Sequence, residues 1–181
     1  MFYKEATFFK REENMKKYTG LLVLILGMGC FGGYYYEDMT FYKSDSFGND
    51  TDVTQVRLQG AACIRETTDE FGSDTKINVE ELPIEYCIPL LVAQAVKEEF
   101  GNCAPQEFTL KQDQFGNDFD TTILKLDTDC LCYVEIRDEF GSDVKIFKKF
   151  SSLDTCGRFF SPTQFSRIRA IAEEVSRKYE H

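Results

Sequence analysis

The chain has 181 residues, of which 43% are hydrophobic and 29% are charged, with only 4 prolines. This composition excludes a disordered or fibrous protein and indicates one globular domain or two small ones. The net charge of −10 argues against a nucleic-acid-binding protein, because phosphate groups are bound by basic surfaces. The single histidine is His181. A Ser-His or Cys-His catalytic pair and a histidine-ligated zinc site are therefore not expected.

The first thirty residues have the pattern of an export signal. A basic flank that ends at Lys17 precedes an uncharged run, 18–36, with an apolar centre and small residues after it. Here the sequence resembles a bacterial prolipoprotein, in which small residues precede a cysteine that is lipidated and becomes the mature N-terminus. In this chain that cysteine would be Cys30. The resemblance implies a cleaved signal peptide over 1–29 and attachment to a membrane through the lipid.

Two other interpretations of this segment remain open. The uncharged run approaches the roughly 20 residues that cross a bilayer, so it can also be an uncleaved anchor with Tyr34 to Tyr36 at the interface. It can also be a buried helix of a soluble protein. The lipoprotein and the anchor both place the rest of the chain outside the cytosol. We therefore predict a location in the bacterial cell envelope, membrane-anchored and either periplasmic or surface-exposed.

The cysteine content agrees with export. Seven cysteines are present, and six remain if Cys30 carries the lipid. An even number of cysteines in an exported domain can all form disulfides. A zinc site is the cytosolic alternative, but the chain has no Cys-x-x-Cys spacing. The candidates for disulfide bonds are Cys63, Cys87, Cys103, Cys130, Cys132 and Cys156.

One short turn sequence occurs four times along the chain. Each copy reads Asp-x-Phe-Gly-Asn/Ser-Asp, and the copies begin at Asp45, Asp69, Asp113 and Asp138. The first and third copies share Asn, whereas the second and fourth share Glu and Ser, so the repeated unit is a pair of turns. Corresponding copies lie 68 and 69 residues apart. This regularity indicates an internal duplication.

The duplication also suggests which cysteines pair. An offset of 69 residues maps Cys63 onto Cys132 and Cys87 onto Cys156. Disulfides 63–87 and 132–156 would satisfy the repeat, and Cys103 would then pair with Cys130. Six cysteines allow 15 pairings, so the other connectivities stay open.

The residues around the turns predict an α+β fold that is a tandem duplication of a four-stranded antiparallel meander followed by one helix. Strand-like segments flank each turn, and glycine at the turn supplies the positive φ of a tight hairpin. A helix follows each set, after Pro89 and from a capping box at Ser161, and each helix would close its meander on the apolar face. The predicted organisation is 1–29 signal peptide, 30–38 tether, 39–104 first repeat and 105–181 second repeat. The predicted strands are 39–43, 53–58, 61–67, 76–79, 108–112, 121–126, 131–137 and 144–150.

The two turns of a meander lie at the same end of its sheet, about 10 Å apart. That end would present an aromatic ring and several carboxylates from each turn. Such a surface suits a cationic partner or a calcium ion, although the same Asp residues can simply hold the turns while the Phe rings pack back on the core. The candidate binding tips are Phe47, Phe71, Phe115, Phe140, Asp45, Asp50, Asp69, Asp74, Asp113, Asp118, Asp138 and Asp143, with Asp52 and Asp120 beside them.

The sequence thus predicts a membrane-tethered exported binding lipoprotein. Its partner would be a basic protein, and inhibition or immunity toward such a protein is one possible task. The alternative is a structural envelope component that is stabilised by disulfides or calcium and has no discrete site. We do not expect an enzyme, because the chain lacks a Gly-x-Ser-x-Gly elbow, a phosphate-binding loop and a metal-ligand motif. No cofactor is predicted, except that calcium at the Asp turns stays open.

Overall fold

The computed structural model describes residues 39–179. The expected signal peptide, the expected lipidation site at Cys30 and the expected tether lie outside these residues. In the described part, no helix is long and apolar enough to cross a membrane.

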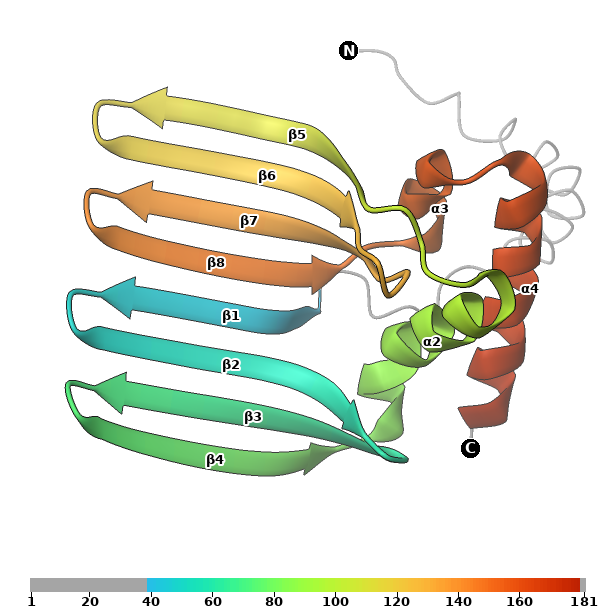
Figure 1. The fold of residues 1–181 in the computed structure, drawn as a ribbon, viewed down its shortest axis with the longest axis horizontal. Coiled ribbons are helices and arrows are strands. Elements are labelled where there is room, and N and C mark those ends of the chain that lie inside the picture. The colour runs from blue at the N-terminus through green and yellow to red at the C-terminus, as the bar shows by residue number, and fades with distance from the viewer. Residues whose placement is uncertain (1–38, 180–181) are drawn as a thin grey trace, which may run out of the picture. The chain divides into compact units, whose positions relative to one another are not determined.

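Eight antiparallel strands form one sheet (Figure 1), in the spatial order β4-β3-β2-β1-β8-β7-β6-β5. The first four strands are one meander and the last four are another, which confirms the α+β class and the two four-stranded meanders. The strands are β1 Thr40–Phe47, β2 Asp50–Gln59, β3 Ala62–Phe71, β4 Asp74–Leu82, β5 Gln106–Phe115, β6 Asp118–Leu126, β7 Cys132–Phe140 and β8 Asp143–Phe150.

The two meanders are joined by the pairing of β1 with β8. Asp45 lies opposite Lys145 and Tyr42 lies opposite Lys148 across this junction. We expected two modules, each with its own sheet, and the structure shows a single continuous sheet instead. The reason is that β1 and β8 are the outer strands of their meanders, and outer strands carry unpaired backbone groups that favour pairing.

The strand registers of the two meanders correspond residue by residue around the turns. Phe47 pairs with Asp50 in the first turn, and Phe115 pairs with Asp118 in the third. Gly48 has a φ of 60° and the next residue does not have a positive φ, which is the type II′ geometry that matches the twist of a hairpin. A difference appears in β5, where a bulge at Leu110 shifts the register with β6.

The helices lie at the end of the sheet opposite to the Phe-Gly turns (Figure 1). We expected each helix to close its own meander, and this was wrong for the C-terminal helix, whose buried face packs on the other helix. Val92 and Val96 of α2 pack in one cluster with Ile168 and Ile171 of α4. The helical segments are η1 Ile84–Cys87, α2 Ile88–Phe100, α3 Leu153–Cys156, η2 Gly157–Phe159 and α4 Pro162–Tyr179.

Local sequence explains where these helices begin. Pro89 occupies the first turn of α2, where its missing N–H costs nothing. Before α4, the Ser161 backbone N–H donates to Gln164 Oε1 and the Gln164 N–H donates to Ser161 Oγ. This reciprocal pair is the predicted capping box, and it satisfies two of the free amide groups at the helix start.

Among residues 39–179, the core lies near the helices, and no other element of this part of the chain covers the outer half of the sheet. The residues of β4 before Leu82 are all exposed, and so is every residue of β5. The buried strand residues belong to the half nearest the helices; they are Val56, Cys63, Ile64, Leu82, Leu124, Leu126, Tyr133 and Phe150.

Three disulfides join Cys63 to Cys87, Cys103 to Cys130 and Cys132 to Cys156. This is the repeat-matched pairing, and it confirms the disulfide prediction. Two of the bonds tie a strand to the helical segment that follows its meander, and the third ties the link between the repeats to the β6–β7 loop. All three therefore reinforce the helical end.

The position of the core predicts how stability is divided along the strands. Leu124 is fully buried, whereas the ring of Phe47 is mostly exposed. Replacing Leu124 with Ala should lower the free energy of unfolding by about 2–5 kcal/mol, because it leaves a cavity in the core. Replacing Phe47 with Ala should change it by less than about 0.5 kcal/mol. Urea denaturation followed by circular dichroism measures both, and equal losses would contradict the one-ended core.

Candidate functional site

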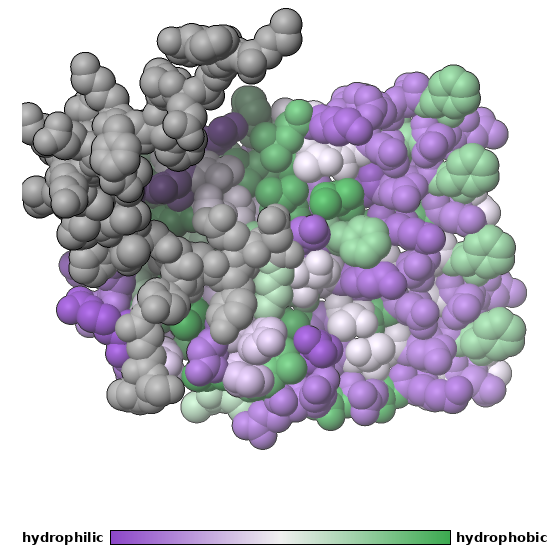
Figure 2. All heavy atoms as spheres, turned by 180° about the vertical axis from the view of Figure 1, so that it is seen from behind, coloured by the Kyte–Doolittle hydropathy of each residue, from purple (hydrophilic) through white to green (hydrophobic). Residues whose placement is uncertain are grey.

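Four phenylalanine side chains stand exposed along one end of the sheet. Figure 2 shows apolar groups in a line at this end, surrounded by hydrophilic residues. They are the Phe residues of the four turns, and their exposed fractions lie between 64% and 89%. The rings therefore do not pack back on the core, which was one of the two roles considered for them. Exposed aromatic rings of this number in one row are unusual on a protein surface. The row consists of Phe71, Phe47, Phe140 and Phe115.

The single sheet is what aligns these rings. Their order follows the order of the strands, with one ring for every second strand. Because neighbouring strands lie about 4.8 Å apart, successive rings are about 10 Å apart and the row spans about 30 Å. The sequence predicted two pairs of tips, and the pairing of β1 with β8 places the pairs in one row.

Carboxylates alternate with the rings. Asp74 pairs with Phe71, and Phe71 pairs on its other side with Asp50. The same arrangement recurs in the second repeat. Residues that pair directly share one face of a sheet, so the rings and these carboxylates project from the same face. We call this outermost line the Phe–Asp row; in strand order it contains Asp74, Phe71, Asp50, Phe47, Asp143, Phe140, Asp118 and Phe115.

A second line of charges lies two residues inward on the same face. Three neighbouring Asp residues and one Lys recur in each repeat, and Asp45 of the first repeat reaches Lys145 of the second at 3.8 Å. Directly opposed like charges destabilise a sheet, so each Asp triplet has an electrostatic cost. We call this line the Asp–Lys row; in strand order it contains Lys76, Asp69, Asp52, Asp45, Lys145, Asp138, Asp120 and Asp113.

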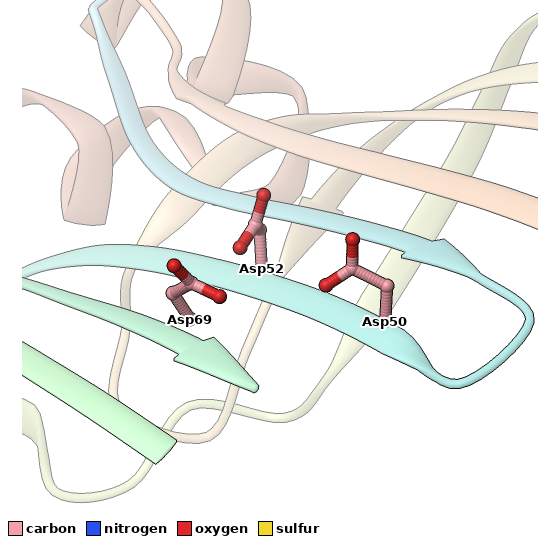
Figure 3. A group of neighbouring side chains, drawn as sticks. All are labelled: Asp50, Asp52 and Asp69. Atoms are coloured by element: carbon pink, nitrogen blue, oxygen red, sulfur yellow. The ribbon is translucent and has the colours of Figure 1, made fainter. Parts of the chain in front are cut away.

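The two rows together form two matching groups of three carboxylates. In the first group, Asp50 and Asp52 project from β2 and Asp69 projects from β3 (Figure 3). One oxygen of each lies within 4.8 Å of an oxygen of the others. The second group lies within the same distance limit and consists of Asp118, Asp120 and Asp138. Each group can supply three of the six to eight oxygen ligands that calcium takes.

The surroundings of Asp120 disfavour the charged form of its carboxyl group. Its Oδ1 is buried and accepts no hydrogen bond from the described residues. Burial, followed by the charges of Asp118 and Asp138, raises the pKa of Asp120, although Lys111 opposes the shift. Ionisation of Asp120 therefore destabilises the folded chain.

Backbone hydrogen bonds hold the tips together in pairs. The Gly72 N–H of the second turn donates to the Asn49 carbonyl of the first, at 3.2 Å. The Gly141 N–H donates to the Asn117 carbonyl in the same way. These bonds support the single-layer end, where side-chain packing contributes little.

A cavity of about 410 Å³ lies between the repeats at the helical end. Residues of both repeats line it, so it was considered as the location of an enzyme site between the repeats. Asp127 accepts hydrogen bonds from the backbone N–H groups of Asp129 and Leu131, and Asp129 forms an ion pair with Lys97 at 2.6 Å. The carboxylates of this cavity therefore serve structural roles. The tip residues named from the sequence lie at the opposite end of the strands.

Sequence reasoning identified every ring and carboxylate of the tips but not their arrangement. The lysines of the Asp–Lys row were missed, although Lys76 and Lys145 are related by the same 69-residue offset as the cysteines. The 69-residue offset could therefore have identified these two lysines in the sequence.

Comparisons with models of protein families, with curated proteins and with solved structures found no match for this chain.

The raised pKa of Asp120 makes its effect on stability depend on pH. The folded chain binds this proton more tightly than the unfolded chain. The contribution of Asp120 to the free energy of unfolding therefore falls as the pH rises from the ordinary carboxyl pKa of 3.8 through the raised value. Asp120→Asn should therefore increase the free energy of unfolding at neutral pH and have little effect below pH 3.8.

Urea titrations at the two pH values measure this difference. Glu173→Gln on α4 removes the same charge far from the tips and serves as the control. A loss of stability at neutral pH in Asp120→Asn would contradict the repulsion that we describe.

Proposed function

We propose that the chain is a binding module whose ligand-facing surface is the Phe–Asp row together with the Asp–Lys row, and that its partner is a basic protein. The observation that supports this most directly is the line of four exposed Phe rings on a face that also carries many carboxylates. The fold does not need these rings, because the core lies at the other end of the strands.

The chemistry of the rows fits cationic side chains. A Lys or Arg of a partner that enters between two rings can contact an aromatic face and an Asp at once. Exposed ion pairs contribute at most about 1 kcal/mol each, whereas burial of a Phe ring contributes about 1.5–3 kcal/mol. We therefore assign the affinity mainly to the rings, and the steering of the basic partner mainly to the carboxylates.

We also propose that this module is exported and tethered to a membrane through a lipid on Cys30, in the bacterial cell envelope. The three disulfides support export, because stable disulfides form in oxidising compartments. Inhibition of, or immunity to, a basic toxin or hydrolase is the task that such a location favours. The matching registers of the two meanders support their origin by tandem duplication.

The second candidate function is a structural envelope component that is stabilised by disulfides or calcium. The two matching carboxylate groups favour it, since a divalent ion would relieve their repulsion. This candidate predicts that calcium raises the melting temperature and that changes at the tips affect stability but no interaction.

The rings can be tested without changing the net charge. Replacing Phe47, Phe71, Phe115 and Phe140 together with Ala should weaken binding to poly-L-lysine at least tenfold, with the melting temperature nearly unchanged. Phe100→Ala removes an exposed ring at the end of α2 and should leave binding as it was. Biolayer interferometry at increasing salt concentrations measures both. Equal binding by the four-fold variant would show that only bulk charge is recognised, and would contradict the role of the rings.

The carboxylates are tested in the same assay. Asp138→Asn with Asp143→Asn should weaken binding and reduce its salt dependence. Glu173→Gln with Glu174→Gln makes the same change of charge on α4 and should have a smaller effect. A shift in melting temperature without a change in binding would favour the structural candidate.

Processing of the N-terminal segment is tested by the intact mass of the protein from its native membrane. We expect a mature chain that begins at a diacylglyceryl Cys30 and has six oxidised cysteines. A chain that still begins at Met1, or that contains free thiols, would contradict the proposed location.

A further inference from the structure

Both outer strands of the sheet present open edges. The strand order ends at β4 on one side and at β5 on the other, and no strand among residues 39–179 pairs with the outer side of either. Each edge therefore carries a row of backbone N–H and C=O groups that another strand can bind. Neither strand contains a proline, and β4 pairs with β3 without a bulge.

These edges carry exposed apolar side chains. Outside the tips, the large exposed hydrophobic residues of the described chain are Phe100 and four others, and those four lie on β4 and β5. Their exposed fractions lie between 46% and 65%. Both strands also carry charged residues, and β5 has a bulge at Leu110, which are features that protect open edges in other proteins. The large exposed apolar side chains beside these charges are what indicates a surface that another chain covers. The four residues are Ile77, Val79, Phe108 and Leu110.

The junction inside the chain shows what fits these edges. In the repeat, β5 corresponds to β1 and β4 corresponds to β8. Because β1 and β8 pair within the chain, the two free edges are the same two kinds of strand that already form an interface. Neighbouring strands alternate in direction through the whole sheet. As a result, β5 of one copy meets β4 of another in the antiparallel sense, with the tips at the same end.

The register of the internal junction can be transferred to this contact. Asp45 lies opposite Lys145 and forms an ion pair with it at 3.8 Å. The equivalent residues are Asp113 on β5 and Lys76 on β4, which again have opposite charges. The same register places Gln112 opposite Ile77 and brings Leu110 beside Val79.

The Asp–Lys row shows the same complementarity. In the first repeat, Lys76 is followed across the strands by three Asp residues, and the third of them, Asp45, meets Lys145 of the second repeat. At the free edges this order of charges across the strands stops. Lys76 forms no ion pair with the described residues, and Asp113 pairs only with Lys111 of its own strand, at 2.5 Å. Further copies would continue the same order of charges at both edges.

We propose that the chain associates with further copies of itself by pairing β5 of one copy with β4 of the next. The contact joins two different surfaces, so it is heterologous and leaves a free edge at each end of the assembly. The sheet would continue from copy to copy, and every added copy would extend the line of Phe tips by four. This inference does not rest on the proposed function, since it needs only that the two edge strands pair, although Lys76 and Asp113 of these strands also belong to the Asp–Lys row.

Self-association is measured on the full-length protein in a mild non-ionic detergent. Sedimentation velocity should show an average mass that increases with protein concentration, in steps of one chain. The variant in which the four tip Phe are replaced with Ala should show the same increase in mass as the wild type, which separates this inference from the proposed binding function.

Charge exchange at the edges tests the register. Lys76→Asp alone places two acids opposite each other at the contact, at positions 76 and 113. Asp113→Lys alone places two bases opposite each other at the same positions. Each single variant should self-associate at least tenfold more weakly. An equimolar mixture of the two variants should recover association, because both edges then meet opposite charges, and the double variant should recover it as well. Glu173→Lys on α4 is the control and should associate like the wild type.

Three outcomes would overturn the proposal. The first is a wild-type chain that stays monomeric at every concentration. The second is a closed dimer whose mass does not increase further. The third is an Asp113→Lys variant that associates normally, since this would indicate pairing of β4 with β4. Circular dichroism and melting temperatures of the single variants establish that a lost association is not lost folding.

Discussion

The pairing of β1 with β8 determines most of what is distinctive in this protein. Without it, the two repeats would be separate four-stranded meanders, each of which presents two rings. With it, the eight antiparallel strands form one sheet, and the four turns form a single line at one end of it. Its side-chain contacts include the ion pair between Asp45 and Lys145, the packing of Lys148 over the Tyr42 ring and, near the helices, the stacking of Phe41 on the buried Phe150. The exposed contacts are individually weak, so the backbone hydrogen bonds and the stacked Phe pair contribute most to the stability of the junction.

The second property that shapes the molecule is the separation of its core from its tips. Both long helices and all three disulfides lie at one end of the strands, and the buried side chains lie there too. A sheet usually needs a second layer on at least one face to be stable. Here the outer half has none among the described residues, and the turns are held by the type II′ geometry and by the bonds from Gly72 to Asn49 and from Gly141 to Asn117.

Much of this architecture follows from the sequence, since local patterns specify it. Repeated turn sequences located the hairpins, and the 69-residue offset of Cys63 and Cys132 identified the disulfides. The capping box at Ser161 located the start of α4. What could not be predicted depends on contacts between distant segments. Nothing local in β1 or β8 indicates that they pair, because each also reads as an ordinary edge strand. The packing of α2 on α4 is of the same kind, because the apolar stripe of a helix does not say which surface covers it. The alignment of the four rings depends on the pairing of β1 with β8, so it could not be predicted either.

The distance between the tips and the core also affects how such a protein can diverge. A residue that lies outside the core and forms no part of the strand junction is free of most selection for folding. Replacements at the ring and carboxylate positions would change what is recognised while the cystine-linked base keeps the scaffold intact. Relatives of this chain should therefore differ most at the turns and least around Leu124 and the half-cystines, much as antibody loops vary over a constant framework.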